Sequence, residues 1–249
     1  MIDLHSHILS GLDDGARDLE DSVNMAITAY EKGTRIIAAT PHSYYLDRYH
    51  YGNEVNALLE AYELLKYALE EENIPIKLIT GMEILGDRDT ADRLLKERLL
   101  TLNNTKSPLI EFDFDVDEDF IWDVMQDVRG AGFTPILAHP ERYKCLYYNT
   151  PLAYDLYKSD VVLQVNKGSI LGHFGRRVEE TARRILNHRL AALVASDAHN
   201  IYSRTTDMLD LSYFLDDNYG EGCSNLLLLE NPRRIIAGEP VIWADPIPF

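Results

Sequence analysis

Short apolar runs alternate with amphipathic stretches along the whole chain. Most of the runs are β-branched or continuously apolar, which is typical of parallel strands that are covered on both faces. The predicted strands are Ile2–His7, Arg35–Thr40, Ile76–Glu83, Pro108–Phe112, Thr134–His139, Val161–Asn166 and Ala191–Asp197.

Stretches with helical spacing lie between these strands. Their apolar positions are Leu19, Val23, Ala26, Ile27 and Tyr30, with Gly33 as a C-terminal cap, then Val55, Leu58, Leu59, Tyr62, Leu65 and Leu69, and later Val178, Ala182, Ile185 and Leu186. Seven strands alternating with helices predict an α/β fold, a closed or nearly closed β/α barrel, with a doubly wound open sheet as the alternative. Because no linker, low-complexity tract or internal repeat interrupts the pattern, we expect one domain over residues 1–249.

The composition narrows the class of protein. The chain has 249 residues, 46% of them hydrophobic, so a buried core is expected and global disorder is excluded. Its 24 basic and 41 acidic residues give a net charge of −17, which disfavours binding to nucleic acid or to anionic membranes. No apolar run approaches the roughly 20 residues of a membrane span, and polar residues begin at Asp3, which argues against a signal peptide.

The two cysteines, Cys145 and Cys223, are too few for a disulfide framework. This usage fits a reducing compartment. The composition therefore predicts a soluble, cytoplasmic, acidic protein.

Histidines and carboxylates recur where the predicted strands end, the edge at which reactive groups gather in barrels and open α/β sheets. In the first strand, alternation directs His5 and His7 to the same side, where they can hold one metal ion, although this spacing is as often structural. Asp13 and Asp14 follow in a glycine-bounded turn, and alone they would be interpreted as turn and helix-terminus charges.

Later strand ends repeat the pattern. Each such residue by itself is explained as a satisfied polar side chain, but their recurrence in a chain with eight histidines indicates a shared site. The donors are nitrogen and oxygen without a thiolate, which suits Mn²⁺, Zn²⁺ or Fe²⁺, and their number suits two or three ions that share carboxylates and keep open positions. The candidate ligands are His5, His7, Asp14, His42, Glu83, Glu111, His139, Asp197 and His199.

Most of these candidate ligands belong to short motifs that follow one another along the chain. The motifs are Asp3-x-His5-x-His7, Asp13-Asp14-Gly15, Thr40-Pro41-His42, Gly81-Met82-Glu83, His139-Pro140-Glu141-Arg142, Ser196-Asp197-Ala198-His199-Asn200 and Asn231-Pro232-Arg233-Arg234-Ile235. They resemble the PHP (polymerase and histidinol phosphatase) superfamily and, within it, the CpsB/YwqE type of bacterial tyrosine phosphatases from capsule and exopolysaccharide operons. The resemblance spans nearly the whole chain.

The resemblance implies a distorted (β/α)7 barrel with a trinuclear centre. It implies a Mn²⁺-dependent protein-tyrosine phosphatase whose partner is the tyrosine-rich tail of a membrane-associated kinase that controls polysaccharide export. No ligand position of the family is lost. The implied ligand sets are His5, His7, Glu83 and Asp197 for one ion, Glu83, Glu111 and His139 for a second, and Asp14, His42 and His199 for the third.

Such ions would lower the pKa of a bound water, place the hydroxide in line with the leaving oxygen and neutralise charge on the phosphoryl group. We expect a bridging hydroxide near the first pair as nucleophile. A phenol leaves easily because its pKa is about 10, so the expected proton donor is no more than a metal-bound water or a histidine near the third ion.

The catalytic set predicted around the metals consists of Asp197, His42, Arg142 and Arg204. The resemblance supports both arginines as phosphate contacts, and guanidinium matches phosphate geometry. The alternative is a pair of surface arginines in ion pairs on an acidic protein.

Several other residues have no firm role. The tyrosines after His42 either wall a phenyl ring or are ordinary loop aromatics. The remaining histidines are expected on the surface or on helices. These residues are Tyr44, Tyr45, Tyr49 and Tyr51, and His50, His173 and His188.

A cysteine-dependent phosphatase is excluded. That mechanism needs an arginine six positions after a low-pKa cysteine, and Pro151 and Leu229 stand six positions after Cys145 and Cys223. Both cysteines are expected in the core or at the surface without a catalytic role.

Three other functions are considered. A small-molecule phosphomonoesterase, such as a histidinol-phosphate phosphatase, would share the metal chemistry of the tyrosine phosphatase and differ in the residues that line its substrate site. A nuclease is disfavoured by the net charge, and a metal-stabilised scaffold without catalysis is disfavoured by the complete ligand set. The basic residues that a nuclease could use near one predicted helix are Arg176, Arg177, Arg183 and Arg184.

Overall fold

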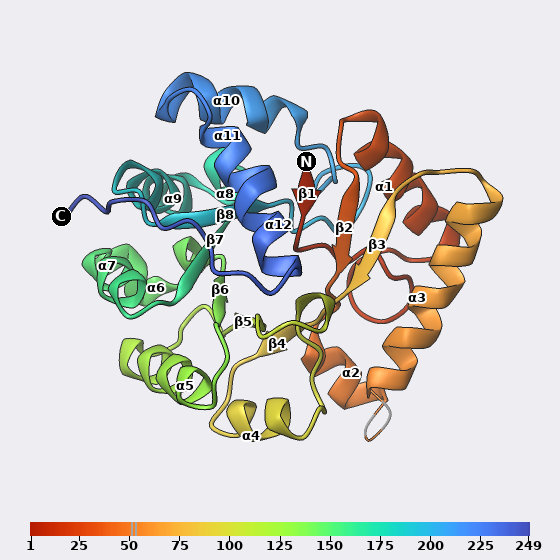
Figure 1. The fold of residues 1–249 in the computed structure, drawn as a ribbon, viewed down its shortest axis with the longest axis horizontal. Helices are drawn as coiled ribbons and strands as arrows, with labels where there is room; N and C mark the ends of the chain where they lie inside the picture. Colours follow the sequence, from red (N-terminus) through yellow and green to blue (C-terminus); the bar gives the residue numbers. More distant parts are fainter. Residues whose placement is uncertain (51, 53) are drawn as a thin grey trace.

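The computed structural model describes residues 1–50, 52 and 54–249. Figure 1 shows short strands in the middle of the molecule and most of the helices around its outside. All strand pairs are parallel. The strands of the described residues are β1 (Ile2–Asp3), β2 (Ile36–Ala39), β3 (Lys77–Thr80), β4 (Glu83–Leu85), β5 (Leu109–Glu111), β6 (Ile136–Ala138), β7 (Val162–Asn166) and β8 (Ala191–Ala195).

Hydrogen bonds divide these strands into two sheets, a three-stranded one in the order β1-β2-β3 and a five-stranded one in the order β4-β5-β6-β7-β8. Two isolated parallel bridges join the sheets: Ser6, after β1, pairs with Ala198, after β8, and His42, after β2, pairs with Glu83 in β4. The predicted parallel α/β fold is therefore confirmed, whereas the described strands form two sheets rather than one continuous hydrogen-bonded barrel.

The predicted strand Ile76–Glu83 is in fact two strands, β3 and β4, which belong to different sheets. At Gly81, between them, the chain passes close to its neighbours: an added Cβ would lie 2.8 Å from Leu102 Cδ2 and 3.0 Å from Thr40 Cγ2. The prediction of a single strand was wrong because an apolar run does not reveal where the chain crosses from one sheet to the next.

The three predicted helices are present as α1 (Leu19–Glu31), α3 (Glu54–Glu71) and α9 (Arg176–Asn187). Asp18 caps α1, because its carboxylate accepts a hydrogen bond from the Asp21 N–H. The other α-helices are α2 (Ser43–Tyr49), α4 (Thr90–Leu95), α5 (Glu118–Gly130), α6 (Lys144–Tyr148), α7 (Pro151–Lys158), α8 (Lys167–Ile170), α10 (Leu209–Tyr219), α11 (Cys223–Asn225) and α12 (Asn231–Ile236).

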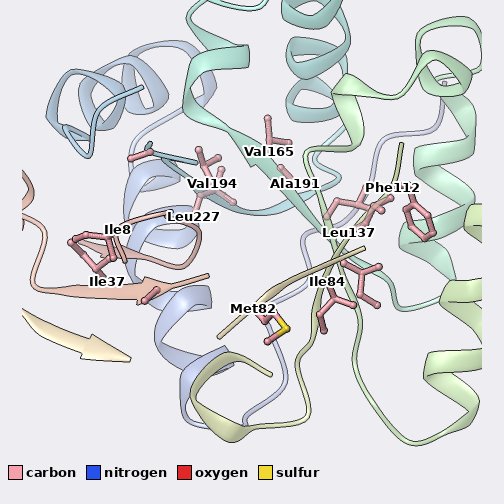
Figure 2. Close-up of a cluster of buried hydrophobic side chains, with 14 of the residues drawn as sticks. Ile8, Ile37, Met82, Ile84, Phe112, Leu137, Val165, Ala191, Val194 and Leu227 are labelled. Carbon is pink, nitrogen blue, oxygen red and sulfur yellow. The ribbon is translucent and has the colours of Figure 1, made fainter. Parts of the chain in front are cut away.

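Two apolar clusters lie on opposite faces of the strands. The outer cluster packs the strands against the helices, and Figure 2 shows part of it, including Ile37, Leu137, Val165 and Val194. The inner cluster joins residues of both sheets with α12, and its members include Ile2, Ala38, Ile79, Leu109, Ile136, Val162, Leu193 and Ile235.

The candidate site lies on the same face of the strands as the inner cluster, because side chains alternate between the two faces along a strand. Val162 of β7 belongs to this cluster, so Gln164 and Asn166, two and four positions later, share its face of the strand. Both are fully buried. The inner face is therefore apolar where β7 begins and polar where it ends. Within the described residues, no helix has the length and apolarity needed to cross a membrane.

Candidate metal centre

The nine candidate ligands lie together at the carboxyl ends of the strands. They follow β1, β2, β6 and β8 or belong to β4 and β5, except Asp14, which lies in the loop between β1 and α1. Each of them has a donor atom no more than 3.4 Å from a donor atom of another member. We call this group the donor cluster.

Glu83 is the centre of the donor cluster. Its Oε1 lies 3.2 Å from His5 Nε2 and 2.7 Å from His139 Nε2. Its Oε2 lies 3.2 Å from His7 Nε2 and 2.9 Å from His42 Nδ1. A carboxylate that is 1% exposed thus contacts four imidazoles.

Among the described residues, three sets of donor atoms are compact enough to hold a cation, each with all atoms within 4.8 Å of one another. Two resemble the expected first and third ligand sets. In the second, His42 takes the place expected for His139, whose Nε2 lies 4.0 Å from Glu111 Oε2. The sets are His5, His7 and Glu83; His42, Glu83 and Glu111; and His7, Asp14, His42 and His199.

The chemistry of the donor cluster fits divalent cations. The Nε2 atoms of His5 and His7 stand 3.3 Å apart, and each lies 3.4–3.6 Å from Asp197 Oδ1. Within the described part of the chain, the buried Nδ1 of His139 has no hydrogen-bond partner. Imidazole nitrogens and carboxylate oxygens without a thiolate are donors that Mn²⁺, Zn²⁺ and Fe²⁺ accept.

Two members of the donor cluster have unusual backbone conformations. His139 directly follows β6 with φ of 35°, and Asp197 lies two residues after β8 with φ of 51°. Residues other than glycine rarely adopt this left-handed region, at a cost of roughly 1–3 kcal/mol. The chain bears this strain where it turns both side chains into the cluster, as is typical of functional sites.

Asp13 orients His7. One carboxylate oxygen of Asp13 accepts hydrogen bonds from His7 Nδ1, at 2.7 Å, and from the His42 N–H, at 2.9 Å. A neutral His7 that keeps its proton on Nδ1 for this hydrogen bond presents Nε2 to a cation. At Gly15 an added Cβ would lie 2.1 Å from the His7 carbonyl oxygen, so this turn requires glycine.

Strand β7 carries no candidate ligand but supports two of them. Gln164 Oε1 lies 2.9 Å from His5 Nδ1, and Gln164 Nε2 donates to Asn166 Oδ1 at 2.7 Å. Asn166 Nδ2 in turn donates to Asp197 Oδ2 at 2.5 Å, while its N–H donates to Glu141 Oε1 at 2.9 Å. The sequence pattern pointed to a turn for Asp13 and to no particular role for Gln164 or Asn166. Amide side chains at alternate positions of an apolar strand were the available signal.

The shared burial of acids and imidazoles moves their pKa values apart. Burial opposes the charge of Glu83, but His5 and His42 outweigh it and hold its pKa well below the usual range. Burial and the nearby Glu83 raise the pKa of Glu111 to about 7. For His42, burial is outweighed by Glu83 and Glu111, and its pKa rises to about 10, whereas burial lowers the pKa of His139 to about 4. Cations that bind here must therefore displace protons.

Both predicted phosphate contacts, Arg142 and Arg204, reach the cluster. Arg204 Nη2 lies 2.6 Å and Arg142 Nη1 3.4 Å from Asp197 Oδ2. The other oxygen of Asp197 faces His5 and His7. Both arginines thus pair with a buried member of the donor cluster, rather than with a surface acid as in the alternative interpretation.

The remaining residues singled out in the sequence lie outside the donor cluster. Tyr45 of α2 has its ring 5.8 Å from that of His42, and Tyr44 and Tyr49 are exposed on the same helix. Tyr51 lies outside the described residues. The others are His50, at the end of α2, His173, between α8 and α9, His188, at the end of α9, and the free cysteines Cys145 and Cys223.

The basic residues of α9 do not form an open positive surface. Arg176 pairs with Glu180 at 2.7 Å, and Arg183 pairs with Glu179 at 2.9 Å. Arg177 and Arg184 lie over the rings of Tyr148 and Phe249. This arrangement gives no support to the nuclease alternative.

Fold and site together define a class, an α/β protein with a buried histidine and carboxylate cluster, suited to several divalent cations, at the carboxyl ends of parallel strands. Residues 1–237 match the family model for capsular polysaccharide synthesis, CpsB/CapC. The chain belongs to the CpsB/CapC family.

Relatives cover nearly the whole chain. It is 36% identical over 248 residues to the tyrosine-protein phosphatase YwqE of Bacillus subtilis, covering 100% of this chain and 96% of the relative. It is 29% identical over 241 residues to the tyrosine-protein phosphatase CpsB of Streptococcus pneumoniae, covering 95% and 98%. A solved structure, from work on YwqE and CpsB as unique metal-dependent tyrosine phosphatases, is similar with a TM-score of 0.91 and 35% identity over 100% of this chain and 99% of that one.

Replacement of Asp13 tests the support of His7. Asp13→Ala removes the acceptor of the His7 Nδ1 proton, so we expect metal affinity to fall about 10–100-fold. Titration with Mn²⁺ and elemental analysis of the purified protein measure this. Asp113→Ala, which removes an exposed carboxylate beyond β5, is the control and should bind metal normally. Equal metal affinity of the two variants would contradict the assignment.

The pH dependence of stability tests the burial of Glu141. Burial raises the pKa of Glu141 to about 7, from 4.5. The folded state therefore holds a proton that the unfolded state releases, and stability is lost as the pH rises from about 4.5 to 7. Urea unfolding at pH 5 and pH 8, with the same metal present, should show Glu141→Gln gaining up to roughly 3 kcal/mol over the native protein at the higher pH. A difference that does not change with pH would refute this.

Proposed function

We propose that this protein is a metal-dependent protein-tyrosine phosphatase that hydrolyses phosphotyrosine and regulates a tyrosine kinase of capsular or exopolysaccharide biosynthesis. The observation that carries the proposal is the donor cluster, complete in a chain that aligns from end to end with YwqE. The substrate is the phosphorylated, tyrosine-rich tail of such a kinase. The free thiols of Cys145 and Cys223 support a cytoplasmic location.

We assign the ligands in three sets, two of which share Glu83, and Mn²⁺ as the metal, with Zn²⁺ and Fe²⁺ as alternatives. Bound divalent cations would supply a water of lowered pKa as nucleophile and positive charge for the phosphoryl oxygens. Glu83 is shared by two sets, since both of its oxygens face imidazoles. The sets are His5, His7, Glu83 and Asp197; Glu83, Glu111 and His139; and Asp14, His42 and His199.

The side chains of the protein bind and orient the substrate. Arg142 and Arg204 converge on Asp197 Oδ2, so a phosphoryl group beside Asp197 would be within reach of both guanidinium groups. His42 lies at the cluster edge next to Tyr45, and the tyrosines of α2 form one wall for the phenyl ring. The phenol leaves with little proton donation because its pKa is about 10.

The whole chain acts as one domain with the architecture of a distorted (β/α)7 barrel. The inner apolar cluster spans both sheets, and the bridges Ser6–Ala198 and His42–Glu83 join them at both places where they meet. The short β3 and β4 together occupy the position of one barrel strand. These observations support closure of the ring around the inner cluster.

Turnover of a phosphotyrosine peptide tests the proposal. The purified protein, loaded with Mn²⁺, should hydrolyse the peptide, lose activity in a chelator and regain it when Mn²⁺ is restored. Histidinol phosphate, tested in parallel, should be a much poorer substrate. Failure of every metal-loaded form to hydrolyse any aryl phosphate would refute the proposal.

His139→Ala should lower turnover more than about 100-fold, because it removes a ligand from the centre of the site. Circular dichroism should show that the fold is retained. His173→Ala, a histidine outside the donor cluster, is the matched control and should keep full activity. Near-normal turnover of His139→Ala would show that this strand end was wrongly assigned.

Arg142→Ala should raise KM for the phosphopeptide about tenfold, because a charge-assisted contact to phosphate is lost. Metal content should stay unchanged, since the guanidinium binds no cation. Arg129→Ala, which breaks an exposed ion pair with Asp160, serves as control. An Arg142→Ala variant that lost metal rather than substrate affinity would contradict this role.

A further inference from the structure

The two phosphate-facing arginines share an aromatic support. The Arg142 guanidinium carbon lies 4.3 Å from the ring centre of Phe114 and 4.7 Å from that of Phe174. The Arg204 guanidinium carbon lies 5.7 Å from the ring centre of Phe174. Phe174 therefore contacts both cations, which come from different loops of the chain.

The position of Phe174 is built into the fold. It lies in the loop between α8 and α9, and its ring packs on the backbone of Gly168 in α8. A Cβ added to Gly168 would lie 2.8 Å from Phe174 Cε2 and 3.1 Å from Cζ. The Phe174 ring can therefore pack here only because residue 168 has no side chain.

A ring holds an arginine differently from a carboxylate. The π face attracts the flat side of the guanidinium and leaves the N–H groups at its edge unused. Elsewhere in this chain, N–H groups of arginines donate hydrogen bonds to acidic side chains. Arg93 Nη2, for example, donates to both oxygens of Asp47, at 2.8 and 2.9 Å. Arg204 also uses one N–H group on an acid, since its Nη2 lies 2.6 Å from Asp197 Oδ2, but its buried Nε has no hydrogen-bond partner in the part of the chain that is described.

We propose that Phe174 is a positioning residue that holds Arg142 and Arg204 by their faces, so that their N–H edges are presented together to the phosphoryl group. This inference rests on the proposed phosphatase function and adds to it the element that sets phosphate affinity. In a chain with an excess of 17 acidic residues, the aromatic support keeps two cations oriented while, among the described residues, the Asp197 carboxylate is their only ionic partner.

The test compares four variants of Phe174, all loaded with Mn²⁺. In Phe174→Ala, KM for the phosphotyrosine peptide and the inhibition constant of inorganic phosphate should both rise about tenfold, through loss of a cation–π contact to each arginine. The value of kcat and the bound metal should be unchanged. Phe174→Tyr and Phe174→Trp should restore native values, whereas Phe174→Leu, which keeps apolar bulk without a π face, should not.

Two further variants separate this role from simple loop packing. Gly168→Ala should weaken phosphate binding in the same direction, because the added methyl displaces the ring. It also provides the test if Phe174→Ala does not fold. Leu171→Ala, which trims an exposed side chain of the same loop, should have no effect.

Unchanged KM and phosphate inhibition in Phe174→Ala, or full rescue by leucine, would overturn the inference. Failure of the proposed function would be distinguishable, because the native protein itself would then turn over no phosphotyrosine. Inorganic phosphate binding would still report on Phe174 in that case.

Discussion

The burial of one carboxylate constrains the whole site. Removing the charge of Glu83 from water costs several kcal/mol unless partners surround it. Imidazoles after β1, β2 and β6 supply those partners, at 2.7–3.2 Å. Glu83 also stands where the two sheets meet, paired with His42. The same contacts of Glu83 therefore position both the strands and the donors, and a change in either disturbs the other.

Around this centre the supporting contacts are arranged in layers. Asp13 and Gln164 each hold the Nδ1 side of an imidazole, which directs Nε2 inward. Asp3 accepts hydrogen bonds from both the N–H and the hydroxyl of Ser196, and so ties β1 to the strained turn at Asp197. Further out, the arginines rest on aromatic rings. Polar contacts thus hold the inner donors, and aromatic contacts hold Arg142 and Arg204, the groups for which we propose contact with the phosphoryl group.

Much of the candidate site could be predicted, because strand ends of parallel α/β folds face one edge and histidine is rare enough to be noticed there. His139 and Asp197 were found in this way although both lie beyond the strands in left-handed turns. The break at Gly81 could not be found, since an apolar run has the same pattern whether or not it changes sheet. The contacts of Gln164 and Phe174 were missed because their partners are distant in the sequence, and that of Asp13 because the turn alone explains its charge.

The amino-acid sequence alone was enough to predict the alternation of strands and helices, the family resemblance and the candidate donors. These are properties of residue type and spacing, which local physical rules can interpret. Only the tertiary structure decided which donor faces which, the division into two sheets and the shared support of Arg142 and Arg204. Those depend on distances between segments up to nearly two hundred residues apart, such as Asp3 and Ser196, and no local pattern encodes such distances.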